Sequence, residues 1–412
     1  MNIRREVYLP HPRPGTAVNM STYYIGSGLD KVEIHSLEHE GRNDLPVDPM
    51  VRYSPDNGRT WSDFEPLPEI VTFGEGSTFY WGGSAPFYDP VSGLSVSIWL
   101  RQTIVAEPLR YHCHCFSRVS DDFGRTWGEA RMIRYEDGPE FNPDNPLDPN
   151  FLTSNNSYPG NNFICHSSGY ILQSLTSINV PDYVVNTDPD GTHGNWWSPS
   201  GARDIGSACF TGTWNPDIRN YDWTCGERIW VPMSVSSRGL MEAETAELKD
   251  GRIVVIWRAS NTPETPGRKW FSVSTDGGRR MSSIQDLRYD DGTQFYSPSS
   301  YHKLFRHSIT NKLYWIGNIC PEPPDGNSPR YPLIIAEVDE AIPSIKRSTV
   351  TIIDDRNPDD SVDLALSNFN VLENRETHDL ELSFTRLGTK ASYADDPDRF
   401  WEADHYKYTI TL

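Results

Sequence analysis

The sequence has no run of about 18 apolar residues, so it predicts no membrane-spanning helix. Basic residues are also in deficit, because 37 lysines and arginines stand against 57 acidic residues, a formal net charge of −20. Nucleic acids and anionic membranes favour basic surfaces, so we expect neither as a partner. The opening MNIRREVYLPHPRPGTAV has no apolar signal-peptide segment. Nevertheless, we expect a secreted protein whose leader has been removed, rather than a cytoplasmic protein.

Cysteine is scarce, and the six cysteines show no tight metal-ligand spacing. Cys113 and Cys115 are two positions apart on a predicted strand, so they share a face, and neighbours at that spacing rarely bridge each other. A disulfide between Cys209 and Cys225 is one alternative for the remaining thiols. Scattered free cysteines, as in a cytosolic protein, are the other.

Turn-forming and aromatic residues are abundant instead. The chain has 30 glycines and 32 prolines, and its 12% aromatic content includes 13 tryptophans and 20 tyrosines. Many short strands joined by frequent turns have this composition. The sequence therefore predicts an all-β protein.

Three segments share the pattern S-x-D-x-G-x-x-W or a near match, and each follows an alternating strand. They are Ser54–Trp61 (SPDNGRTW), Ser120–Trp127 (SDDFGRTW) and Ser274–Met281 (STDGGRRM). The pattern suits a hairpin turn, because Asp accepts backbone N–H bonds, Gly supplies a positive φ and Trp packs back on the strands. Three matches, each after a strand, indicate a structural repeat.

These turns resemble the Asp boxes of the sialidase-like (BNR-repeat) superfamily. The resemblance implies a β-propeller of four-stranded antiparallel blades. In that family the box joins the third and fourth strands of a blade, on the face away from the active site. We therefore assign the box residues a structural role only.

The strands arrange into six blades within one domain, residues 1–412. The blades lie near 15–70, 76–135, 158–236, 240–290, 297–354 and 364–412, and the N-terminal REVYLP is expected to complete the last one. Seven blades would require two within 136–236, where too few strands are seen. Long connections near 136–157, 180–207, 320–331 and 387–404 are expected on the face opposite the boxes, where such loops are usually functional.

The segment from Glu242 to Arg258 is similar to a sialidase site. True sialidases have a Glu opening this strand and an Arg closing the next, and here the two are 16 positions apart. The resemblance implies that Glu242 raises the nucleophilicity of a Tyr, while Arg258 binds a substrate carboxylate. A guanidinium matches a carboxylate geometrically and stays charged. Glu244 is the alternative carboxylate on the same strand.

Other candidates come from the ends of predicted strands and from the long connections. Arg101 and Arg386 both end second strands, so with Arg258 they could form a carboxylate clamp. Tyr301 is the expected nucleophile, with Tyr296 as the alternative. As bases or acids near neutral pH we consider His112 and His193. Trp81 and Trp196 are further candidate substrate-binding residues.

The expected function is an exo-acting, sialidase-like glycoside hydrolase that cleaves a terminal glycosidic bond of an acidic oligosaccharide or polysaccharide. Asn2–Arg5 and Pro12–Pro14 do not reproduce the Arg-Ile-Pro motif of true sialidases. One alternative is therefore a lyase acting beside a uronate by β-elimination, and another is a non-catalytic glycan-binding propeller. None of these requires a cofactor, although a structural calcium ion on the propeller axis is compatible with the fold.

Overall fold

The computed structural model describes residues 1–39, 47–67, 72–73, 78–81, 86–105, 110–179, 204–232, 234–389 and 396–412. Within these ranges the strands form six antiparallel sheets. The chain divides into two compact units. Unit 1 comprises Met1–Pro68, Pro266–Lys269 and Asp286–Leu412, and unit 2 comprises Glu69–Thr265 and Trp270–Gln285.

Unit 1 contains three of these sheets. The first has the order β2 (Thr16–Tyr24), β3 (Lys31–His39), β4 (Val47–Ser54), β5 (Glu65–Pro66). The second has the order β21 (Lys303–Arg306), β22 (Leu313–Asn318), β23 (Leu333–Asp339), β24 (Ser344–Ile345), and β25 (Thr351–Asp354) also pairs with β23. The third has the order β1 (Asn2–Leu9), β28 (His405–Thr411), β27 (Leu380–Thr385), β26 (Asn370–Glu373).

Unit 2 contains the other three. One runs β11 (Arg131–Met132), β10 (Arg110–Ser120), β9 (Leu94–Val105), β7 (Thr78–Trp81), β6 (Thr72–Phe73), with β8 (Phe87–Asp89) also on β9. The next runs β12 (Ser157–Cys165), β13 (Ile171–Asn179), β14 (Asp204–Asn215), β15 (Asn220–Cys225), with β16 (Ile229–Trp230) also on β14. The last runs β17 (Met241–Glu247), β18 (Ile253–Arg258), β19 (Trp270–Ser274), β20 (Gln285–Asp286).

In the described part of the chain, helix is confined to short pieces of the connections. α1 (Pro149–Thr153) lies in the predicted 136–157 connection and α2 (Pro397–Phe400) in the 387–404 connection, and each has an Asp N-cap and an early proline. A 3₁₀ turn covers Arg347–Thr349. No helix in the described ranges is long and apolar enough to cross a membrane. Of the 180–207 connection, residues 180–203 lie outside the described residues.

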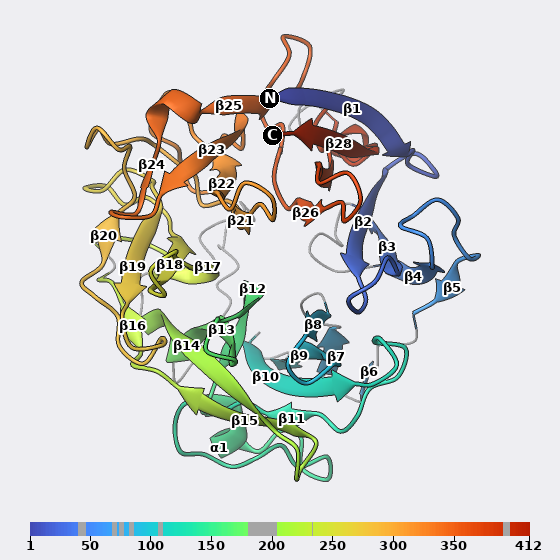
Figure 1. The fold of residues 1–412 in the computed structure, drawn as a ribbon, viewed down its shortest axis with the longest axis vertical. Helices are drawn as coiled ribbons and strands as arrows, with labels where there is room; N and C mark the ends of the chain where they lie inside the picture. The colour runs from blue at the N-terminus through green and yellow to red at the C-terminus, as the bar shows by residue number, and fades with distance from the viewer. Residues whose placement is uncertain are drawn as a thin grey trace. The chain divides into compact units, whose positions relative to one another are not determined.

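The N-terminal strand completes the last sheet, as the sequence predicts. β1 pairs with β28 in antiparallel register from Asn2 opposite Thr411 to Leu9 opposite His405. Figure 1 shows the two chain termini beside each other in this sheet. The ladder hydrogen bonds thus tie the first residues of the chain to the last.

The three predicted turns share one set of hydrogen bonds. In the first, the Ser54 hydroxyl accepts from the N–H of Gly58 over 2.8 Å, and the Asp56 carboxylate accepts from the N–H of Thr60 over 2.8 Å. Gly58 has φ +87°, and a Cβ there would lie 3.3 Å from the Trp61 ring. The same Ser and Asp contacts recur at Ser120–Thr126 and Ser274–Arg280. The turn chemistry read from the sequence is confirmed.

Apolar side chains pack between neighbouring sheets within each unit. In unit 1, residues such as Ile316 and Ile335 from the β21–β25 sheet pack against Leu382 and Phe384 of β27. In unit 2, one cluster joins the β6–β11 and β12–β16 sheets, and a second joins the β12–β16 and β17–β20 sheets. This burial is the main favourable term that holds each sheet to the next.

A second contact also recurs between neighbouring sheets. After β12, the N–H of Ser167 donates to a carboxylate oxygen of Glu247, at the end of β17, over 2.9 Å, and the Ser167 hydroxyl donates to the other oxygen. After β21, the N–H and hydroxyl of Ser308 bond in the same way to Glu373, at the end of β26. A serine turn on one sheet thus binds a carboxylate of the next sheet in both units.

All six cysteines are free thiols, so the Cys209–Cys225 disulfide does not form. In the β14–β15 ladder Cys225 lies opposite Phe210, the residue next to Cys209. Consecutive strand residues point to opposite faces, so the two sulfurs lie on different sides of the sheet. Cys209 and Cys225 accordingly belong to different apolar clusters.

Candidate functional site

Glu242 and Arg258, the pair with sialidase-like spacing, are in contact. Glu242 lies near the start of β17, and Arg258 ends the neighbouring antiparallel strand β18. Nη1 of Arg258 donates to Oε2 of Glu242 over 2.5 Å, and the Glu242 side chain is 25% exposed. The carboxylate is therefore open to solvent on one side while a charge-assisted hydrogen bond balances its charge on the other.

A β-bulge brings Glu242 to this position. Two residues of β17, Glu242 and Ala243, lie opposite the single residue Trp257 of β18. Glu242 has φ +44°, in the left-handed region that glycine usually occupies in such bulges. Holding a glutamate there costs on the order of 1 kcal/mol, and backbone strain of this kind clusters at functional sites.

Polar side chains of the adjacent β12–β16 sheet hold the bulge. The side-chain amide of Asn161 donates to the Glu242 carbonyl over 2.9 Å, and the Glu242 N–H donates to the Thr176 hydroxyl over 3.0 Å. Asn162 bonds both the N–H and the carbonyl of Thr245, over 2.9 and 2.7 Å. The N–H and carbonyl of Glu242 in the bulge, and those of Thr245 beyond it, are thus satisfied from β12 and β13.

These supporting residues were not predicted from the sequence. A Cβ at Gly160 would lie 2.2 Å from the Ser174 carbonyl oxygen and 3.0 Å from that of Ala243, so only glycine allows the strands to approach this closely. A glycine inside a strand, followed by two asparagines, is the local signal that could have marked this approach.

Arg101 is buried beneath the connection that carries α1. Its side chain is in the core at 1% exposure, and its guanidinium lies 3.3 Å from the ring centroid of Phe141. A ligand could reach this guanidinium only if Phe141 moved. The role of Arg101 in binding a substrate stays a prediction.

The two histidines of β10 are also buried. His112 is 4% exposed and His114 is fully buried. The His114 Nε2–H donates to the carbonyls of Phe151 and Ser154 over 3.0 and 3.1 Å. Burial lowers the pKa of His114 to about 4, although these bonds act in the opposite direction, so His114 is neutral at pH 7. The chemistry predicted for His112 remains a prediction.

Arg386 is enclosed by carboxylates of its own unit. Its guanidinium donates to Asp360 over 3.0 and 2.7 Å and to Asp354 over 3.1 Å, and it is 2% exposed. Burial acts to lower the pKa of Arg386, but the Asp360 hydrogen bonds and the Asp354 charge outweigh it and raise the pKa. These contacts occupy the fork that a substrate carboxylate would need.

Tyr301 lies in unit 1, whereas Glu242 lies in unit 2. The Tyr301 ring packs edge-on against Phe369 at 5.2 Å, with the Lys303 ammonium 5.6 Å from its centroid. Tyr296, the alternative, bridges through its backbone to Cys320. Pairing of Tyr301 with Glu242 stays a prediction. Glu244, the alternative carboxylate, is completely buried, so Glu242 is the accessible one.

His193 and Trp196 lie outside the described residues. Trp81 ends β7, opposite Leu100 of β9. Among the described residues no group of three or more His, Cys, Asp or Glu side chains could hold a metal ion.

Comparisons with solved structures identify the fold. A Dyadobacter fermentans protein of unknown function is 12% identical, with 99% of each chain covered and a TM-score of 0.60. The NanB sialidase of Streptococcus pneumoniae is 12% identical, covering 95% of this chain and 68% of its own, with a TM-score of 0.56. An α-L-arabinofuranosidase of Fusarium graminearum is 11% identical, covering 99% and 97%, with a TM-score of 0.51. No protein-family model and no curated protein matches the sequence.

The chain has the six-bladed β-propeller fold. The six antiparallel sheets and the likeness over nearly the whole chain both support this, so the fold class predicted from the sequence is confirmed. Sialidases and arabinofuranosidases share this propeller. At 11–12% identity the likeness describes the fold, and the chemistry has to be argued from the site.

Proposed function

We propose that this propeller is a glycoside hydrolase that removes a terminal sugar from a glycan at the bulge that carries Glu242. The observation that supports this most directly is the strained backbone of Glu242, whose carboxylate is held against Arg258 and stays open to solvent. Most glycosidic-bond hydrolysis uses a pair of carboxyl groups, one that protonates the leaving oxygen and one that acts as base or nucleophile, and Glu242 is proposed for the second role.

Arg258 bears on the substrate class. Its guanidinium is a planar cation whose geometry matches a carboxylate, and Nη1 donates to Glu242. In the proposed mechanism Arg258 orients Glu242 and binds an acidic group of the terminal sugar, while Glu242 activates the attacking group. Tyr301 is the nucleophile that the sequence resemblance suggests. Solved structures with this fold include a sialidase and an α-L-arabinofuranosidase, so both an acidic and a neutral terminal sugar need testing.

The test is hydrolysis of chromogenic sialosides, α-L-arabinofuranosides and β-glucuronides by the wild-type chain and by Glu242→Gln. We expect Glu242→Gln to lower kcat/KM by at least about 100-fold, the range for loss of an acid–base group. Glu129→Gln, an exposed carboxylate of the same unit, is the matched control and should keep wild-type activity. Undiminished activity in folded Glu242→Gln would rule out the assignment.

Two further measurements separate the alternatives. Tyr301→Phe should abolish turnover if Tyr301 is the nucleophile and leave it unchanged if the carboxylate acts directly. On uronate glycans, ultraviolet absorbance from an unsaturated product would identify elimination in place of hydrolysis. Glycan binding without any product would favour a non-catalytic binding propeller.

A further inference from the structure

A small polar cavity lies in unit 1 between the β2–β5 sheet and the β26–β28 sheet. Its volume is about 70 Å³, and it adjoins the first S-x-D-x-G turn through Asn57, Gly58 and Trp61. A buried water needs roughly 10–15 Å³ of such space, so the cavity has room for a group of a few heavy atoms. Pockets that enclose larger ligands measure several hundred Å³, so a group of a few heavy atoms fits this cavity better than a larger ligand.

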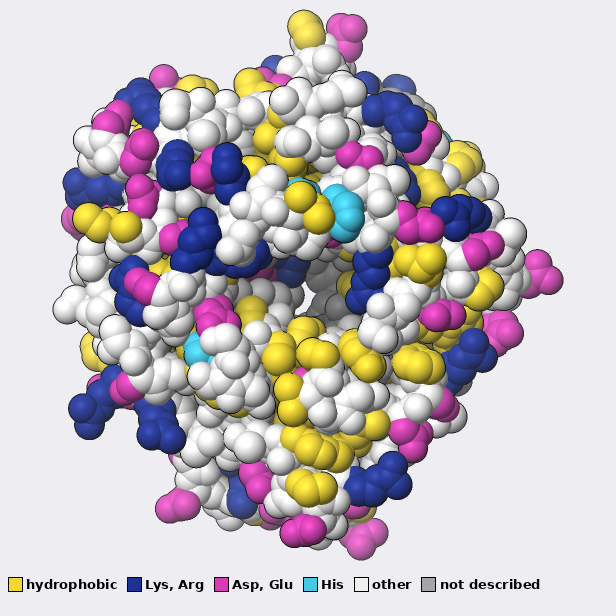
Figure 2. All heavy atoms as spheres, viewed as in Figure 1, with side chains coloured by type: hydrophobic (Ala, Val, Ile, Leu, Met, Phe, Trp, Pro, Cys, Tyr) yellow, Lys and Arg dark blue, Asp and Glu magenta, His cyan; other side chains and the backbone are white. Residues whose placement is uncertain are grey.

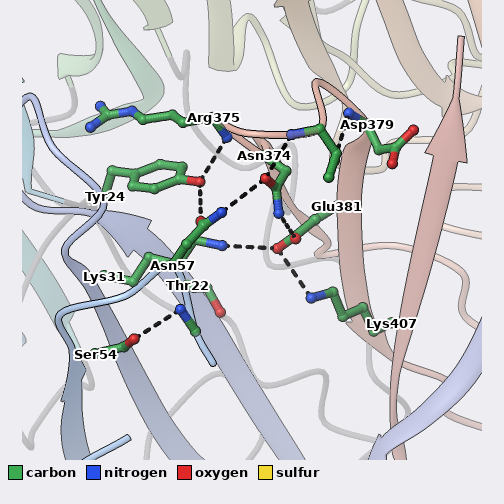
Figure 3. Close-up of polar contacts among 12 residues, drawn as sticks. Thr22, Tyr24, Lys31, Ser54, Asn57, Asn374, Arg375, Asp379, Glu381 and Lys407 are labelled. Atoms are coloured by element: carbon green, nitrogen blue, oxygen red, sulfur yellow. Dashed lines mark hydrogen bonds and ion pairs between the residues drawn. The ribbon is translucent and has the colours of Figure 1, made fainter. Parts of the chain in front are cut away.

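Two lysines meet one carboxylate at this cavity (Figure 3). The Lys31 and Lys407 ammonium groups both lie near Oε2 of Glu381, at 3.2 and 3.1 Å. The other oxygen of Glu381 accepts from the Asn374 amide over 2.7 Å. Lys31 is 2% exposed and comes from β3, while Lys407 is 25% exposed and comes from β28. The single negative charge of Glu381 thus compensates two ammonium groups.

The second carboxylate of the cavity is already engaged. Oε2 of Glu33 accepts from Nε of Arg52 over 2.7 Å, and Oε1 accepts from the hydroxyls of Tyr8 and Thr22 over 2.6 and 3.2 Å. Counting the groups in direct contact, three cations (Lys31, Lys407, Arg52) face two carboxylates (Glu33, Glu381). Among the described residues, the groups in direct contact thus carry one excess positive charge, with Lys31 buried and Arg52 and Lys407 18% and 25% exposed. Two further carboxylates lie outside this contact set, Glu6 opposite Lys407 in the β1–β28 ladder and Glu376.

An uncompensated buried charge is costly, so it is normally paired or neutralised. The net charge of −20 does not neutralise it from a distance, because exposed charges further away than about 10 Å are screened by salt. On the face drawn in Figure 2, acidic and basic side chains are interspersed. The electrostatic potential at any one place therefore depends on the neighbouring side chains rather than on the net charge. Two side chains of the remaining cavity wall already donate elsewhere, Thr22 to Glu33 and Asn57 to Asn374 and Glu376. Ser383 and Asn370 also line the cavity.

We propose that this cavity binds a small monovalent anion, chloride or a short carboxylate such as acetate, between Lys31 and Lys407. The anion supplies the missing negative charge and accepts hydrogen bonds from the ammonium groups and the Ser383 hydroxyl. Because the site joins β3 to β28, the bound anion stabilises the contact between the first sheet and the sheet completed by the N-terminal strand. The inference is independent of the proposed glycosidase activity.

The test is isothermal titration of the full chain with sodium chloride and, separately, sodium acetate, in a bulky sulfonate buffer that the cavity cannot admit. We expect one saturable site per chain for at least one of the two anions. The unfolding temperature should also rise with the logarithm of that anion's concentration. Comparing the two titrations shows whether the halide or the carboxylate is preferred.

Two variants test the location. Lys407→Gln removes one ammonium group, and Ser383→Leu fills the cavity without changing charge, so each should weaken binding at least about tenfold while circular dichroism shows a folded chain. Lys312→Gln, which removes an exposed lysine paired with Glu337 elsewhere in unit 1, should bind like wild type. Absence of saturable binding of both anions, or binding unchanged in folded Lys407→Gln and Ser383→Leu, would overturn the proposal. If neither anion binds, the excess charge would have to be removed in another way, by deprotonation of a lysine.

Discussion

Oε2 of Glu242 reaches Nη1 of Arg258 from a backbone at φ +44°, a conformation that glycine adopts freely and glutamate does not. The contact and the strain are two consequences of one β-bulge, in which Glu242 and Ala243 share a single partner, Trp257. In such a site the carboxylate is positioned at a cost in backbone stability.

The free-energy cost of the left-handed backbone at position 242 can be measured by comparing Glu242→Gly with Glu242→Ala. Both variants lose the ion pair with Arg258, but only Ala retains the Cβ that makes the left-handed conformation unfavourable. We expect Glu242→Gly to be more stable than Glu242→Ala by about 1 kcal/mol in urea unfolding. Equal stabilities would mean that the bulge is not strained in solution.

Gly160 should tolerate no side chain. A Cβ would meet two backbone carbonyl oxygens, of Ser174 at 2.2 Å and Ala243 at 3.0 Å, and neither can turn away as a flexible side chain could. We expect Gly160→Ala to lower the free energy of unfolding by about 1–3 kcal/mol, the usual range for overpacking. Activity should also fall, because the Asn161 amide would no longer donate to the Glu242 carbonyl.

The matched control for that variant is Gly169→Ala. Gly169 has φ +85° but open space around its Cβ position, so the change adds backbone strain without a steric clash. Thermal unfolding and activity of the two variants separate these effects. A Gly160→Ala chain with wild-type turnover would contradict the role given to the β12 asparagines.

Arg386 should behave as a structural residue. Arg386→Met leaves Asp354 and Asp360 buried without their shared cation, and breaking a buried ion pair in this way typically costs about 3–5 kcal/mol. The measurement is the free energy of unfolding at neutral pH. If Arg386 instead bound substrate, the variant would keep its stability and show a raised KM.

The Ser308–Glu373 contact predicts a pH dependence. Burial tends to raise the pKa of Glu373, but the bonds from Ser308 and His378 and the nearby His307 outweigh it and lower the pKa below its usual value near 4.3. The contribution to stability is therefore complete above that usual value and is lost as pH falls through the depressed folded-state pKa.

Glu373→Gln tests this dependence. It should be less stable than wild type at pH 7 by about 1.5–3 kcal/mol, the range for hydrogen bonds to a charged group. The gap between the two proteins should narrow as pH falls below about 4. Urea unfolding at a series of pH values measures it, and a gap that stayed constant with pH would contradict the assignment.

Much of the fold could be predicted from the sequence, because its signals are local. Strand alternation and the S-x-D-x-G turns located six blades, and β1 pairs with β28 as expected. The proximity of Glu242 and Arg258 also followed from local reasoning, since consecutive strands of a hairpin place the start of one beside the end of the next. The bulge at Glu242 could not be predicted, because it depends on polar support from β12 and β13, about 65 to 80 residues away.

The different environments of the three arginines could not be predicted from the sequence. Arg101, Arg258 and Arg386 were all predicted from the sequence to end second strands. The prediction is wrong for Arg101, which lies inside β9 (Leu94–Val105), because that strand continues for four more residues. Only the packing distinguishes them, with Arg101 beneath Phe141, Arg386 between two aspartates and Arg258 beside an accessible glutamate. The sequence by itself determined the blades, the turns and the hairpin that joins Glu242 to Arg258, because hydrogen-bond periodicity and turn geometry act over a few residues. The tertiary structure alone decided which charges are neutralised inside the protein and which remain open to a ligand, because burial and ion pairing depend on residues distant in the chain.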